Sequence, residues 1–174
     1  MSIDQFHRLL QRHAGLIYKV ALTYCRNQTD RQDVIQEIAI ELWKSLDRYD
    51  ARYKESTWIY RIAINVAVSF HRRERRHNHR RESLDSWVFA IEAPSTDSDL
   101  DLELLMKCVD ELGDLDRALV LLYLDGIDHA SIGEILGISV SNVGTKLQRI
   151  KTKLAAAIQR HIQATNQGDC NGTR

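Results

Sequence analysis

The sequence predicts an all-α protein of two small helical domains joined by a flexible acidic linker. Apolar residues recur every three or four positions through most of the chain, which is the spacing of amphipathic helices. No segment shows the strict alternation of a half-buried strand. The only proline, Pro94, lies in a polar acidic stretch between the helical halves. We expect a domain over 1–81, a linker over 82–100, a second domain over 101–163 and a polar, irregular tail over 164–174.

Composition and charge narrow the functional classes. Of the 174 residues, 44% are hydrophobic and 28% charged, as in a globular protein. The 24 basic and 24 acidic residues balance, but they are segregated along the chain. Segments 72–81 and 141–160 are basic, whereas segment 82–116 is acidic. Two basic segments separated by an acidic one suit two contacts with a single polyanion.

The three cysteines are far apart and odd in number, so they predict neither a disulfide framework nor a metal-ligand pair. We expect Cys25 and Cys108 to be buried thiols of a reduced, cytoplasmic protein, and Cys170 to be exposed. No stretch has the length and apolarity of a membrane span, and the amphipathic start of the chain is unlike a signal peptide. Direct membrane insertion is therefore not expected.

The first predicted helix runs from Ile3 to Arg26, and a capping box at Thr29 starts a second helix that reaches about Leu46. Carboxylates occupy one face of this second helix, about 80° wide. This acidic stripe consists of Asp30, Asp33, Glu37 and Glu41. It is either a solvent face, because carboxylates favour helix N-termini, or a docking face for a basic partner. No histidine lies on it, which argues against a carboxylate metal site.

A polar loop, 47–55, with Tyr49 and Tyr53, precedes the third helix, which starts at Ser56 and ends near Arg76 in a run of arginines. One side of this helix is apolar. The opposite side, called here the arginine face, is about 80° wide and holds Trp58, Arg61, Asn65, Ser69, Arg72 and Arg76. Arginines meet phosphates while rings and amides meet bases, so this face suits a nucleic-acid strand. The alternative is a solvated charged surface.

The C-terminal half has the layout of a DNA-binding helix-turn-helix. Helices are expected over about 102–112, 115–124, 129–136 and 140–161. Gly133 is small where two helices approach closely, Gly137 suits the positive φ of a turn, and Ser139 or Ser141 can cap the last helix. One side of that helix carries amide, hydroxyl and basic groups, as expected of a recognition helix in a major groove: Asn142, Thr145, Lys146, Arg149 and Lys153. An ordinary helical hairpin is the alternative.

With these segments in place, the sequence resembles a bacterial RNA polymerase sigma factor of the extracytoplasmic-function (ECF) group, in the sigma-70 superfamily. Three blocks carry the resemblance, which covers about 6–157. The acidic helix from Asp30 to Trp43 is similar to the family's D-x-x-D-x-x-Q-E…W helix. The stretch from Thr57 to Asn65, with the arginines that follow, is similar to its promoter-melting segment. The helix-turn-helix is the third block.

The resemblance implies partners and roles for individual residues. Core RNA polymerase, through its clamp coiled coil and flap, and promoter DNA are the implied partners, and an anti-sigma factor is a weaker expectation. The implied polymerase-binding residues are Asp30, Asp33, Gln36, Glu37, Glu41 and Trp43. The loop and Asn65 would capture a base flipped from the minus-ten element, within a set comprising Tyr49, Tyr53, Trp58, Arg61, Asn65, Ser69, Arg72, Arg73 and Arg76. The implied minus-thirty-five residues are Ser141, Asn142, Thr145, Lys146, Arg149 and Lys153.

The chain departs from the family pattern at several positions. Gly113-Asp114 stands where proline is common, Gly133 where alanine is common, and Gly144 where lysine or arginine is common. Gly144 lies inside the recognition helix, where glycine costs roughly 1 kcal/mol relative to alanine. These differences bear on promoter affinity more than on the kind of function.

Two other functions stay open at this point. A stand-alone helix-turn-helix regulator would bind operator duplex without polymerase. An enzyme would need a site such as the histidines His71, His77 and His79 near Glu74, but the surrounding arginines repel a cation. We therefore expect no enzymatic activity, no cofactor, no metal and no small-molecule substrate.

Overall fold

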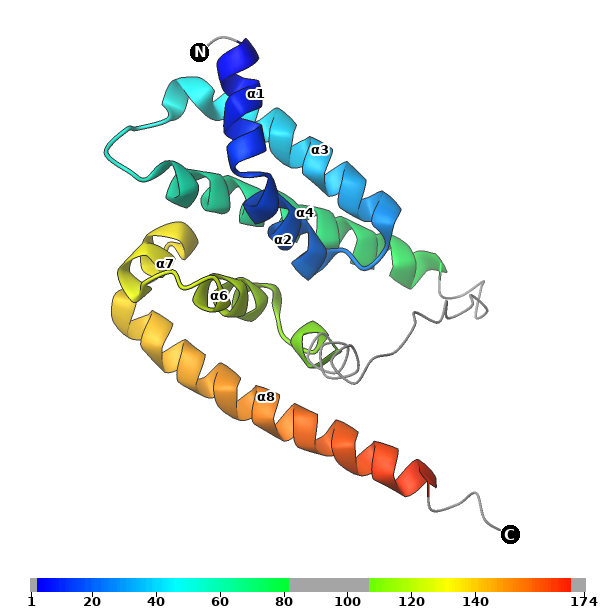
Figure 1. Ribbon diagram of the computed structural model, residues 1–174. Helices are drawn as coiled ribbons and strands as arrows, with labels where there is room; N and C mark the ends of the chain where they lie inside the picture. Colours follow the sequence, from blue (N-terminus) through cyan, green and yellow to red (C-terminus); the bar gives the residue numbers. More distant parts are fainter. Residues whose placement is uncertain (1–2, 82–106, 170–174) are drawn as a thin grey trace.

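The computed structural model describes residues 3–81 and 107–169, which are almost entirely helical and contain no strand (Figure 1). The all-α prediction is therefore confirmed. The predicted linker 82–100 lies outside the described residues, as does Cys170. The helices are α1 (Ile3–Arg12), α2 (Ala14–Tyr24), α3 (Gln28–Ser45), the 3₁₀ turn η1 (Leu46–Arg48), α4 (Glu55–Arg81), α6 (Asp114–Leu124), α7 (His129–Leu136) and α8 (Val140–Asp169).

The N-terminal domain is built around α4, which packs against both α2 and α3. Val34, Ile38 and Leu42 recur at helical spacing on α3 and are fully buried. On α4 the small residues Ala63 and Ala67 are also fully buried, which lets neighbouring helices approach closely. The apolar stripes predicted from spacing are the faces that form this core.

Two helix boundaries in this domain differ from the prediction. The single helix expected over 3–26 is broken at His13, whose backbone leaves the helical region at φ −108° and ψ 13°. Glycine at position 15 weakens helix continuation, and the His13 ring is held by Glu55 at 2.8 Å. The cap of α3 is Asn27 rather than Thr29, because the Asn27 side chain accepts from the Asp30 amide at 2.7 Å.

The C-terminal domain contains the predicted helix-turn-helix, formed by α7 and the start of α8. Asp128 caps α7 by accepting from the Ser131 amide, a cap that the sequence reading did not identify. Gly137 ends α7 at φ 68°, and Ser139 accepts from the amide of Asn142 at 3.2 Å. Both the glycine turn and the serine cap confirm the prediction.

Helix α8 continues to Asp169, past residue 164 where an irregular tail was expected. Elongating a formed helix fixes only one more residue per hydrogen bond, and the sequence between Gly144 and Gly168 contains no proline or glycine that would weaken it. Cys25 and Cys108 are buried, as predicted. Within the described ranges, the helices all lack the combination of length and apolarity that a membrane crossing requires.

The two domains pack against each other through α2 and α4 on one side and α6 and α7 on the other (Figure 1). Their buried apolar residues form one continuous cluster that extends from Phe6 on α1 to Ile150 on α8. Helix α8 runs away from the N-terminal domain along most of its length (Figure 1). The sequence reading did not predict this contact between the domains.

The two helix-interior glycines of the helix-turn-helix give a matched test of packing. A Cβ at Gly133 would lie 2.8 Å from the backbone oxygen of Ile138, whereas a Cβ at Gly144 would meet nothing within 4 Å. We expect Gly133→Ala to lower the free energy of unfolding by about 1 kcal/mol, because overpacking outweighs the gain in helix propensity. Gly144→Ala should raise it by about 0.5–1 kcal/mol. Urea unfolding of both variants checks this, and equal signs for the two would contradict it.

Candidate nucleic-acid interface

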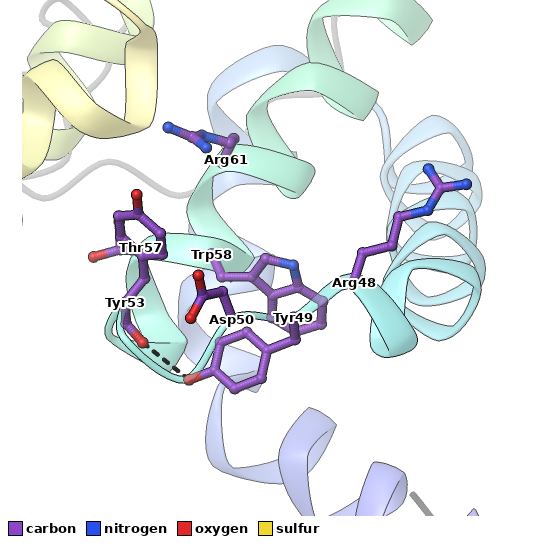
Figure 2. Close-up of a pocket in the computed structure, with 7 residues that line it drawn as sticks. All are labelled: Arg48, Tyr49, Asp50, Tyr53, Thr57, Trp58 and Arg61. Carbon is purple, nitrogen blue, oxygen red and sulfur yellow. Dashed lines mark hydrogen bonds between the residues drawn. The ribbon is translucent and has the colours of Figure 1, made fainter.

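A cavity of about 120 Å³ lies between the loop after η1 and the first turns of α4 (Figure 2). The rings of Tyr49 and Trp58 meet there, with centroids 5.0 Å apart and planes at 48°. The Tyr49 hydroxyl donates to the carbonyl of Tyr53 at 3.0 Å, which closes the loop on itself. The lining residues are Arg48, Tyr49, Asp50, Tyr53, Thr57, Trp58 and Arg61.

Polar groups complete the cavity wall. Asp50 accepts from the backbone amide of Arg52 at 3.0 Å and from its guanidinium Nε at 2.8 Å. These hydrogen bonds lower the pKa of Asp50, so its carboxylate is ionised at neutral pH. Arg61 points out of the cavity toward α7 (Figure 2). Aromatic rings beside a carboxylate suit a flat group with hydrogen-bond donors, such as a nucleic-acid base.

The structure brings together four of the residues predicted to contact the minus-ten strand. Tyr49, Tyr53, Trp58 and Arg61 all line this one cavity. Asn65, which was expected to share in base capture, is exposed further along α4 and is not among the lining residues.

Three further lining residues, Arg48, Asp50 and Thr57, were not singled out by sequence reasoning. Arg48 and Asp50 flank Tyr49 directly. Thr57 is a buried polar residue that directly precedes Trp58, and this position next to a predicted site residue is the only feature in the sequence that points to it.

The arginine face of α4 is divided between solvent and intramolecular partners. Asn65, Ser69 and Arg76 are exposed. Arg61 donates to the carbonyl oxygen of Glu134 on α7, and Arg72 Nε donates to Asp114 on α6 at 2.8 Å. Two of the guanidinium groups predicted to hold DNA therefore contact the C-terminal domain in this structure.

Arg73, the next arginine along, turns toward α3. Its guanidinium donates to both carboxylate oxygens of Glu37, at 2.7 and 2.8 Å, and lies over the ring of Phe70. A residue predicted to hold DNA is thus paired with a residue predicted to bind polymerase.

The other residues predicted to bind polymerase face solvent to different degrees. Asp33 and Gln36 are exposed, and Glu41 pairs with Lys44 at 2.7 Å. Trp43 is 44% exposed and packs edge-on against Phe6, with ring centroids 5.0 Å apart. The side chain of Asp30 accepts from Asn27 at 2.7 Å, so this carboxylate also takes part in the cap of α3.

The recognition helix, at the start of α8, presents a polar side to solvent. Ser141, Asn142, Thr145, Arg149 and Lys153 are exposed. Lys146 and Lys153 each lie 3.6 Å from a carboxylate oxygen of Asp116 on α6. Both lysines are therefore loosely paired with the same carboxylate.

Glu55, at the first residue of α4, anchors this helix to the N-terminal helices. Its Oε2 lies 2.9 Å from Arg12 Nη1 and 2.8 Å from His13 Nε2. These contacts, led by the hydrogen bond with His13, lower the pKa of Glu55. The anchor fixes the end of the loop that carries the cavity, and the sequence reading had not identified it.

Of the three histidines considered as a metal site, the structure describes the side chain of His71 alone. His71 is directed toward the C-terminal domain, with Nε2 4.0 Å from Asp114 and its ring against Tyr24. Burial, assisted by Arg117, lowers the pKa of His71. In the described portion of the chain, no three His, Cys, Asp or Glu residues are grouped to hold a metal ion. The side chains of His77 and His79 lie outside that portion.

Two family models match the chain, and they divide it as the domains do. Sigma-70 region 2 matches residues 9–77, and sigma-70 region 4 matches residues 102–154. The chain is 28% identical over 162 residues to the ECF RNA polymerase sigma factor SigW of Bacillus subtilis, covering 84% of each sequence. It is 27% identical over 172 residues to the ECF RNA polymerase sigma factor SigE of Mycolicibacterium smegmatis, covering 95% of this chain and 66% of that relative.

A solved structure shares the fold. It is the sigma factor RpoE of Bartonella quintana in complex with the anti-sigma factor NepR, with a TM-score of 0.72, 18% identity and coverage of 90% of this chain and 98% of that one. The fold and surfaces define a two-domain helical protein with a DNA-binding helix-turn-helix. The chain belongs to the sigma-70 family of bacterial RNA polymerase sigma factors, in the ECF group.

The Glu55 anchor generates a pH-dependent prediction. A carboxylate whose pKa is lower in the folded state stabilises the fold above its unfolded pKa of about 4.5 and loses this contribution as pH falls through the folded pKa. Glu55→Gln should lower the free energy of unfolding at pH 7 by about 0.5–1 kcal/mol, and the gap from the natural protein should close as the solution is acidified below pH 4.5.

Urea unfolding at several pH values measures this gap. Glu134→Gln, which removes an exposed carboxylate on α7, serves as the control and should show little effect. A gap that stays constant from neutral to acid pH would contradict the role of Glu55 as a charged anchor.

Proposed function

We propose that this protein binds core RNA polymerase and directs it to a subset of promoters. In this proposal the N-terminal domain melts and reads the minus-ten element. The helix-turn-helix reads the minus-thirty-five element. The observation that carries the proposal is the aromatic cavity of Tyr49 and Trp58 beside the arginine face of α4. A flipped base would enter the cavity while arginines hold the adjoining phosphates. Membership of the ECF group supports this assignment.

The proposal gives the acidic stripe the role of a polymerase-docking face. Asp33 and Gln36 are exposed on α3, and Trp43 adds a half-exposed ring. Carboxylates around an aromatic group suit a basic helical partner, such as the clamp coiled coil. The exposed side of the recognition helix would meet duplex DNA, with Asn142 and Arg149 directed at base edges and Lys146 and Lys153 at phosphates.

An anti-sigma partner is a secondary part of the proposal. The RpoE structure is a complex with an anti-sigma factor, which supports the expectation that a regulator of this kind binds the present chain.

Run-off transcription on genomic fragments, with core polymerase alone and with this protein added, tests the main function. Tight footprinting of a palindromic duplex by the free protein would instead favour a stand-alone regulator.

Docking through the acidic stripe is tested by charge reversal. Asp33→Arg should weaken binding to core polymerase about tenfold or more, because a carboxylate facing a basic partner becomes a like charge. Asp33 suits this test better than Glu37, whose replacement would also release Arg73. Asp4→Arg, the same charge change in the first turn of α1, is the control. If the Asp33→Arg variant has a normal circular dichroism spectrum and is recovered with core polymerase as well as the natural protein is, the docking face would be discredited.

Base capture is tested at the aromatic wall of the cavity. Tyr49→Ala, alone and combined with Asn65→Ala, should impair promoter opening on duplex DNA and have a smaller effect on a pre-melted template. Base stacking is worth about 1–3 kcal/mol, so an effect of roughly 5- to 150-fold is expected. Tyr49→Phe keeps the ring but removes the hydrogen bond to Tyr53, and should retain most activity. Equal losses on duplex and pre-melted templates would argue against a role in melting.

A further inference from the structure

The N-terminal domain carries an open apolar groove of about 600 Å³, which shares no residue with the aromatic cavity. The groove is lined by α1 and α2 on one side and by α3 on the other. Small side chains leave this space, and even a Cβ added at Gly15 would meet nothing within 4 Å. The lining residues used below are Leu10, Ala14, Gly15, Tyr18, Ile35 and Ale39. None of them belongs to the sets predicted to bind polymerase or DNA.

Discussion

The structure depends on the several packing duties of one helix, α4. Its apolar and small residues, including the fully buried Ile59 and Ala63, pack within the N-terminal domain. Tyr60 and His71 are directed to the C-terminal domain, and Asn65 and Ser69 remain exposed. Because these groups lie on one continuous helix, the first turns of α4, the aromatic cavity and the interdomain contact keep a fixed relation to one another. A change in how α4 is seated therefore affects all three.

Much of this architecture could be predicted from residue spacing, because helical periodicity is a local property. Helix α7 has the predicted bounds, His129–Leu136, and Gly137 has the positive φ expected of a turn. What could not be predicted depends on partners distant in sequence. The break at His13 is stabilised by Glu55, 42 residues away, and Tyr24 reaches Asp114 over 90 residues. No window of sequence contains both members of either pair.

The candidate site follows the same division. The aromatic and basic residues of the cavity could be selected by type and by family resemblance, and Tyr49, Trp58 and Arg61 do lie together. A helical wheel, however, shows only which side of a helix a residue occupies and not what lies opposite. Arg72 meets a carboxylate on α6, and Arg73 meets Glu37 on α3. A basic partner that binds Glu37 would compete with Arg73, so the docking face and the strand-holding arginines are electrostatically coupled.

The energetics of the interdomain contact suit a reversible state. Surface ion pairs each contribute about 0–1 kcal/mol, and partly buried ones more, while the apolar surface shared by the domains adds to them. A partner that binds with nanomolar affinity supplies about 12 kcal/mol. Such a partner can separate domains held by a few kcal/mol and still bind tightly, provided that it prefers the open form. Contacts that are polar at both ends of α6 also leave each separated surface with groups that water can solvate, which lowers the cost of opening relative to an equally large apolar interface.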